Sequence, residues 1–170
     1  MMRPTATELL QTIDATLVQK VEPSLSDVGG RSALATVRHL LNFVRVRIER
    51  EGQLLTNDVA ELRNLLPEMV DYFATRGEGG AAEAVRQALA KPGPQEPGRY
   101  LSLDELAEVA GGLREALHRA LSRLQDMRDL RGGEPQYMAL RSAIRAYVAR
   151  QIENEGEIVG PAFFGRGPRR

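Results

Sequence analysis

The sequence predicts an all-α protein, a helical bundle of about six helices. Apolar residues recur at three- and four-residue steps in each long segment, which is the spacing of one helix face. Thr5 and Ser102 are each followed three residues later by a glutamate, the capping box that begins a helix. No segment alternates apolar and polar residues for long enough to predict a strand.

The first two helices are expected on either side of a glycine pair. The first begins at the Thr5 capping box and ends near Pro23, because proline cannot continue a helix interior. The glycines at 29–30 are expected to break the chain, Ser32 to cap the second helix, and Gly52 to end it as a left-handed C-cap. The apolar faces of these helices, which we expect in the core, consist of Leu10, Ile13, Leu17, Val21, Leu34, Val37, Leu41, Val44 and Ile48.

A third helical segment, at 56–76, contains Pro67 and leaves two alternatives open. Either the helix kinks at the proline, or Asn64 caps a second short helix. Its predicted core face consists of Val59, Leu62, Leu66, Met69 and Phe73. After a glycine-rich turn, a short helix is expected at 81–91. The stretch 92–98 is a linker, since its three prolines and two glycines exclude a helix.

Two further helices are expected after the linker. One begins at the Ser102 capping box, and the glycines at 111–112 allow it to bend. Pro135 suits the first position of the last helix, which we expect Gly156 to cap. The two predicted core faces consist of Leu106, Val109, Leu113, Leu117, Leu121, Leu124, Tyr137, Leu140, Ile144, Tyr147 or Val148, and Ile152.

The chain divides by sequence into two halves that resemble each other. Residues 44–52 and 148–156 share a pattern that ends in Ile-Glu-x-Glu-Gly, and each half opens with a capping box. Two interpretations stay open, a duplicated helical hairpin and the chance recurrence of common capping patterns. The predicted organisation is an N-terminal helical half at 1–91, the linker at 92–98, a C-terminal hairpin at 99–156 that shares one core with the first half, and an irregular tail at 157–170.

Composition excludes several classes of function. The 23 basic and 23 acidic side chains give zero net charge, which argues against a dedicated nucleic-acid or anionic-membrane binder. The absence of cysteine excludes disulfides, thiolate metal sites and a cysteine nucleophile. No apolar run reaches the roughly 18 residues of a membrane helix, and no secretory signal is recognised. We therefore expect a cytoplasmic protein without a cofactor.

Two histidines are the candidates for a catalytic or ligand-binding pocket. Glu115 and His118 form a Glu-x-x-His step, which would place a carboxylate and an imidazole on one helix face. The other histidine, His39, has Thr36 three residues before it, so the second step of a di-iron site is missing. We therefore expect no metal. A pocket lined by His39, Glu115 and His118 remains the alternative to a non-catalytic role.

Arginines and a phenylalanine pair are the candidates for partner binding. Between Leu113 and Arg150, arginines outnumber acids eight to four, which suits either an acidic partner or a solvated surface. Two of the four phenylalanines lie close to the C-terminus and either fold back onto the bundle or dock on another chain. The candidate partner-binding residues are Arg119, Arg123, Arg145, Phe163 and Phe164.

The stretch 3–10, Arg-Pro-Thr-Ala-Thr-Glu-Leu-Leu, resembles the opening of an uncharacterised bacterial family of small helical proteins. Pro23 and a loose Val-x-x-x-Leu-x-x-Val pattern ending in Arg-Glu-Gly at 50–52 extend the resemblance over residues 3–75. Genes of that family lie beside those of acyl-CoA dehydrogenases and of kinases that are similar to aminoglycoside phosphotransferases. The resemblance implies an accessory role near acyl-CoA or phosphoryl-transfer metabolism, with no catalytic residue assigned.

Together these features predict a non-catalytic accessory or protein-interaction module. Its expected partner is another protein, such as an acyl-CoA dehydrogenase or a kinase-like enzyme, or a second copy of the chain in a homo-oligomer. The alternative is a small-molecule binder or an enzyme with a pocket between the helical halves.

Overall fold

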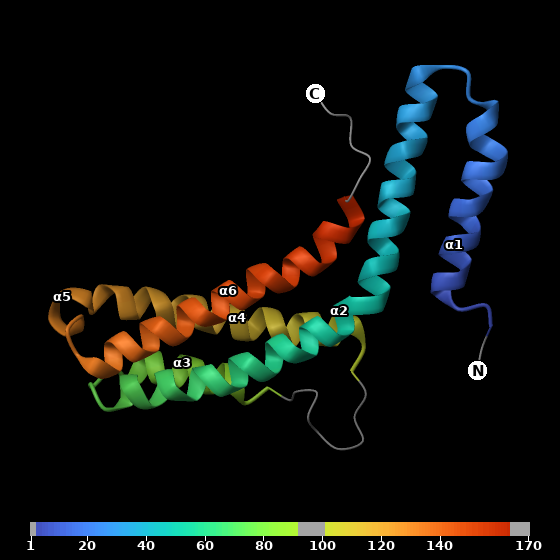
Figure 1. Ribbon diagram of the computed structural model, residues 1–170. Helices are drawn as coiled ribbons and strands as arrows, with labels where there is room; N and C mark the ends of the chain where they lie inside the picture. Colours follow the sequence, from blue (N-terminus) through green and yellow to red (C-terminus); the bar gives the residue numbers. More distant parts are fainter. Residues whose placement is uncertain (1–2, 92–100, 164–170) are drawn as a thin grey trace. The chain divides into compact units, whose positions relative to one another are not determined.

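The computed structural model describes residues 3–91 and 101–163, with side chains up to residue 160. The described residues form six α-helices and no strand, which confirms the all-α prediction (Figure 1). The chain divides into two compact units. We call Met1–Glu51 with Glu153–Arg170 the hairpin unit, and Gly52–Ile152 the core unit. The predicted linker at 92–98 lies outside the described residues.

The core unit encloses the main hydrophobic core. Its helices are α3 (Gly79–Leu89), α4 (Leu103–Asp126), the short α5 (Arg128–Arg131) and parts of α2 (Val28–Ala74) and α6 (Pro135–Phe163). The predicted faces of α2, α4 and α6 supply this core, with Val59, Leu62, Leu66, Met69, Phe73, Leu113 and Leu124 at most 1% exposed. The periodicity therefore located the buried side of all three helices in this unit. Ile152 is an exception, because it is 66% exposed.

Helix α2 runs without interruption through Gly52 and Pro67, so the predicted end at Gly52 is wrong. Glycine lowers helix stability by about 1 kcal/mol but does not force a stop. Here Thr56 Oγ1 donates to the Gly52 carbonyl at 2.8 Å within the continuous helix. Neither a separate helix nor a cap at Asn64 occurs, because burial of the neighbouring Leu66 and Met69 offsets the proline's cost of about 3 kcal/mol.

The turn after α2 depends on Gly77, the one residue among those described with a positive φ, 77°. The Glu78 amide donates to the Phe73 carbonyl at 3.0 Å, which closes the helix end. A side chain at residue 77 would strain this left-handed backbone. The following glycines, 79 and 80, begin α3.

The hairpin unit contains α1 (Ala6–Thr16), which continues as a π-helical segment (Leu17–Val21) and a 3₁₀ turn (Glu22–Ser24). The predicted capping box is confirmed, because Glu8 Oε2 accepts from the Thr5 amide at 2.7 Å and Thr5 Oγ1 accepts from the Glu8 amide at 3.2 Å. Helix α1 runs antiparallel to the first half of α2 (Figure 1), and Arg38 Nε donates to Asp14 Oδ1 at 2.7 Å between them.

Helix α2 begins earlier than the sequence suggested. Asp27 Oδ1 accepts from the Gly30 amide at 2.6 Å, so Asp27 caps the helix. The expected break at 29–30 and the expected cap at Ser32 are therefore both wrong. The glycines lie in the first turn, where the aspartate satisfies an amide that has no intrahelical partner.

Helices α4 and α6 also continue through glycines at which the sequence suggested a bend or an end. The Ser102 capping box is confirmed, with the Ser102 amide donating to Glu105 Oε2 at 2.8 Å, and α4 continues through the glycines at 111–112. Pro135 begins α6 as predicted, but Gly156 does not end it. The tail predicted to be irregular is helical from 157 as far as Phe163, and residues 164–170 lie outside the described residues.

Candidate functional site

An exposed apolar surface on the hairpin unit is the strongest candidate site. The predicted core face of this unit is only partly buried, which corrects the sequence-based expectation. Nine large apolar side chains are exposed, and the described residues of the unit bury only Leu34 and Val46. The surface that we call the hairpin face consists of Leu9 (49% exposed), Ile13 (47%), Val37 (45%), Leu40 (59%), Val44 (44%) and Ile48 (47%).

Both parts of the hairpin face lie on the same side of the helix pair. The Asp14–Arg38 ion pair marks the line along which α1 and α2 face each other. Helical residues turn by about 100° each, so Ile13 and Leu9 lie about 100–140° before Asp14 around α1. By the same count, the four α2 residues of the face lie about 80–160° before Arg38. In an antiparallel pair, side chains that lie the same angle before the facing residues Asp14 and Arg38 point to the same side of the plane through both helix axes. The apolar stripes of α1 and α2 therefore form one surface.

Two arginines beside the hairpin face are paired within the chain. Arg47 Nε donates to Glu51 Oε2 at 3.0 Å, one turn along α2. Hydrogen bonding to Glu51 raises the pKa of Arg47. Hydrogen bonding to Asp14 likewise raises the pKa of Arg38, which lies between the two helices. Carboxylates of the same chain therefore balance these two positive charges.

A second feature is a buried polar group in the core unit that joins three helices. Asp58 on α2 is 1% exposed. The Tyr147 hydroxyl, from α6, donates to Asp58 Oδ1 at 2.7 Å, and Arg114 Nη2, from α4, lies 2.8 Å from Asp58 Oδ2. The contact between Arg114 and Oδ2 is an ion pair but not a hydrogen bond, because no N–H group points at Oδ2 with hydrogen-bond geometry.

The electrostatics of this group follow from its burial. Loss of hydration raises the pKa of Asp58, and the Tyr147 hydrogen bond and the Arg114 charge oppose that effect only in part. Burial first, and then the hydrogen bond to Asp58, raise the pKa of Tyr147. Half-exposed Arg114 reaches the carboxylate from the surface. The arrangement suits a structural tie between helices, because a buried carboxylate needs partners from each neighbouring element.

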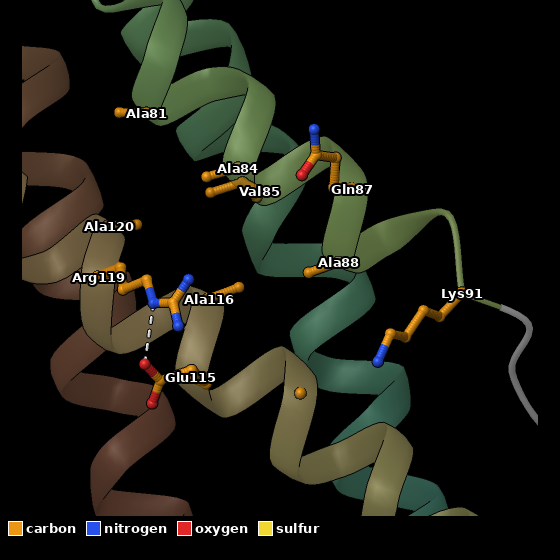
Figure 2. Close-up of a pocket in the computed structure, with 11 residues that line it drawn as sticks. Ala81, Ala84, Val85, Gln87, Ala88, Lys91, Glu115, Ala116, Arg119 and Ala120 are labelled. Atoms are coloured by element: carbon orange, nitrogen blue, oxygen red, sulfur yellow. Dashed lines mark hydrogen bonds and ion pairs between the residues drawn. The ribbon is translucent and has the colours of Figure 1, made fainter.

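A third feature is a groove of about 290 Å³ between α3 and α4 (Figure 2). Small side chains leave this space, and its polar edge includes Lys91 and Gln87. Arg119 Nε donates to Glu115 Oε1 at 2.9 Å at the same edge. The volume is at the lower end of small-molecule sites. The groove can accept a short apolar group, and Glu115 and Arg119 at its edge already pair with each other.

The residues predicted to form a pocket belong to two different units, so a pocket that they share stays a prediction. His39 belongs to the hairpin unit, whereas Glu115 and His118 belong to the core unit. Glu115 lines the α3–α4 groove and bonds Arg119, while exposed His118 is outside the groove lining. Among the described residues, no group of three or more His, Asp, Glu or Cys side chains is placed to hold a metal ion.

The predicted partner-binding arginines differ in their surroundings. Arg119 is paired with Glu115, and Arg123 donates through Nε to Glu78 Oε2 at 2.8 Å. The hydrogen bonds of this last pair raise the pKa of Arg123 and lower that of Glu78. Arg145 is exposed on α6. The binding role of these arginines stays a prediction.

The predicted phenylalanine contact also stays a prediction. Phe163 is the last helical residue of α6, but its side chain lies outside the described part, as does all of Phe164. Within the described ranges, no helix is both long and apolar enough to cross a membrane.

No model of a known protein family, no curated protein sequence and no solved structure matches this chain. The resemblance of residues 3–75 to a bacterial family therefore stays a prediction, and the site has to be argued from its own chemistry.

Sequence patterns did point to parts of these features without identifying them. The spacing that predicts a core face for the first two helices includes four of the six hairpin-face residues but not Leu9 or Leu40. An apolar stripe looks the same in the sequence whether it is covered or exposed. The Asp58 group had weaker signals. Asp58 followed Thr56 and Asn57 in a polar run typical of a helix start, and Tyr147 was assigned to the core without its hydroxyl partner.

Proposed function

We propose that this chain is a non-catalytic protein-interaction module whose hairpin face binds another polypeptide. The observation that carries the proposal is the imbalance in the hairpin unit, with nine large apolar side chains exposed against two buried among its described residues. Single exposed apolar residues are common, but a contiguous stripe on two adjacent helices is typical of an interaction surface.

The form of the hairpin face indicates the kind of ligand. Val37, Leu40, Val44 and Ile48 follow one another at three- and four-residue steps along α2. A partner helix can pack its own apolar residues against such a stripe, in the way that helices dock into helical grooves. A small soluble molecule would cover only a fraction of a stripe that extends over several turns.

The resemblance supplies one candidate for that partner. An acyl-CoA dehydrogenase or a kinase-like enzyme would fit an accessory module encoded beside it, and both are part of this proposal. A cytoplasmic location also belongs to the proposal. The apolar stripe supports a polypeptide partner but does not select among these proteins.

A photo-crosslinking experiment tests the proposal. A photoreactive amino acid replaces Leu40 on the hairpin face, and irradiation follows in cells that express the full chain. We expect a covalent adduct of defined mass with one polypeptide. The matched control carries the same amino acid at Leu130, an exposed leucine of the core unit, and should give no adduct of that mass. No adduct at residue 40, or equal adducts at both positions, would contradict the proposal.

The α3–α4 groove supports a second candidate function, small-molecule binding. The groove lies between a helix before the predicted linker and a helix after it, as the alternative prediction required. Screening acyl-CoAs and nucleotides by thermal shift tests this function. A ligand at a hundredfold its Kd stabilises the fold by about 2.7 kcal/mol. The shift should disappear in Ala84→Phe, which fills the groove, and a shift that persists would place the ligand elsewhere.

A further inference from the structure

We propose that the polypeptide bound by the hairpin face is a second copy of this chain, so that two helix pairs form a four-helix bundle. This inference rests on the proposed function and names its partner. The first argument is the missing core. Helix α1, the first part of α2 and the end of α6 bury few apolar side chains, whereas two copies of the α1–α2 pair can enclose an apolar interior as four helices. In the described part of the hairpin unit, Leu34 and Val46 are the only large apolar side chains that are buried, at 7% and 5% exposed.

The size of the hairpin face fits an interface between two copies. The α2 segment from Val28 to Ile48 is about 30 Å long at about 1.5 Å per residue. Two helices side by side, each about 10 Å wide, give a face of roughly 600 Å² per copy. A pair of copies would then bury roughly 1,200 Å², which is at the lower end of stable specific interfaces. A single partner helix would cover only half of that face, whereas a second copy brings two helices of matching length.

The charge distribution permits the face to meet itself. A two-fold interface places each residue near its own equivalent or near a symmetry-related neighbour, so an unpaired charge would face a like charge. All six residues of the hairpin face are apolar, and the Arg47 guanidinium at its edge is paired with Glu51 of the same chain. The whole chain has zero net charge, so two copies do not repel each other at long range.

The opposite side of α2 is the side that the chain itself contacts. Arg50 Nη1 lies 2.9 Å from Glu157 Oε2 near the end of α6. Counting about 100° per residue, Arg50 and buried Val46 lie about 80–120° beyond Arg38, in the opposite sense from the hairpin face. Within the hairpin unit, the α6 segment therefore approaches the side away from the hairpin face and leaves that face for a second copy.

The middle of the helix pair predicts a specific contact. The Asp14–Arg38 ion pair places Ile13 and Leu40 at nearly the same level, close to the middle of the α2 segment from Val28 to Ile48. A two-fold axis that runs through the middle of the interface, parallel to the helices, brings α1 of one copy beside α2 of the other. Ile13 of one copy then lies close to Leu40 of the second copy.

Sedimentation velocity of the full chain tests the assembly. We expect twice the chain mass of 18.8 kDa at micromolar concentration. The double variant Leu40→Glu/Val44→Glu should be a monomer with an unchanged circular dichroism spectrum, because both positions are exposed in the single chain. The control Leu130→Glu changes an exposed leucine of the core unit and should remain a dimer. A monomeric natural chain, or a double variant that remains a dimer, would overturn the inference.

Cysteine pairs test the orientation, since the natural chain has no cysteine. Chains carrying Ile13→Cys are mixed with chains carrying Leu40→Cys and treated with a short bis-maleimide. We expect the mixed cross-linked dimer to exceed either like-with-like dimer, and an excess of like-with-like products would refute the orientation. If the natural chain is a monomer but residue 40 still photo-crosslinks to a different polypeptide, the second-copy inference fails and the proposed function stands. If neither a dimer nor an adduct forms, both fail.

Discussion

Replacement of Tyr147 by phenylalanine removes one hydroxyl group from the buried polar group of the core unit. That hydroxyl donates to Asp58 Oδ1 at 2.7 Å, and the Asp58 side chain is 1% exposed, so no bulk water replaces the lost donor. A hydrogen bond to a charged group contributes about 1.5–3 kcal/mol to stability. We therefore expect the free energy of unfolding of the core unit to fall by this amount at neutral pH. With a urea dependence of about 2 kcal/mol per molar, the midpoint should fall by about 1 M.

Tyrosine fluorescence provides a suitable assay. The chain has no tryptophan and four tyrosines, all of them within Gly52–Ile152, so the signal follows the core unit alone. The matched control is Tyr137→Phe, which removes a hydroxyl from another buried tyrosine of α6 that makes no hydrogen bond in the described structure. We expect the control to change the midpoint by less than a third as much. Equal effects of the two substitutions, or no effect of Tyr147→Phe, would refute the assignment of a stabilising bond between Tyr147 and Asp58.

Two further predictions concern buried polar groups of the core unit. The hydroxyl of Tyr72 is buried without a hydrogen-bond partner, so Tyr72→Phe should leave the urea midpoint unchanged or raise stability by about 1 kcal/mol, and a clear loss would mean that the hydroxyl is bonded. Burial raises the pKa of Asp58 above the value of about 3.9 in an unfolded chain, so the folded state retains its proton longer. The free energy of unfolding should therefore decline as the pH rises from about 4 through the folded pKa of Asp58. Measuring the same pH series on Asp58→Asn and subtracting it from that of the natural chain should isolate this decline. A difference that rises with pH would show that the fold favours the charged carboxylate.

Local chemistry along the chain was enough to predict much of the fold. Both capping boxes, at Thr5 and Ser102, form as expected, because each depends on residues only three positions apart. Pro135 begins α6 for the same reason, since its fixed φ and missing amide suit a first helical position. The apolar faces of α2, α4 and α6 within the core unit were also predicted. A helix that buries one side has apolar residues at three- and four-residue steps, and this spacing is visible in the sequence.

Several of the wrong predictions concern glycine as a signal for helix ends. Gly52 and Gly156 lie inside α2 and α6, although each follows an acidic segment that resembles a helix terminus. Glycine permits a left-handed cap but does not impose one, and its cost inside a helix is only about 1 kcal/mol. Gly77 ends α2 because the chain turns there toward α3, a requirement that comes from packing.

For the candidate sites too, the sequence shows the spacing of residues along a helix but not their contacts with distant parts of the chain. The spacing of Val37, Val44 and Ile48 predicts one apolar helix face, but no property of the sequence shows whether another helix covers it. The burial of Asp58 is equally invisible, because its partners Tyr147 and Arg114 lie 89 and 56 residues away along the chain. Contacts between residues distant in sequence decide such features, whereas spacing only describes neighbours.

The sequence by itself determined the helical class, the positions of the capping boxes and the apolar side of each helix, because these depend on interactions within one or two turns. Only the tertiary structure decided which of these apolar sides are buried. In the core unit, four helices meet and remove their faces from water, while in the hairpin unit α1 and the first part of α2 leave theirs exposed. The difference arises because burial depends on how many neighbours a helix has, and that number is set by the packing of the whole chain.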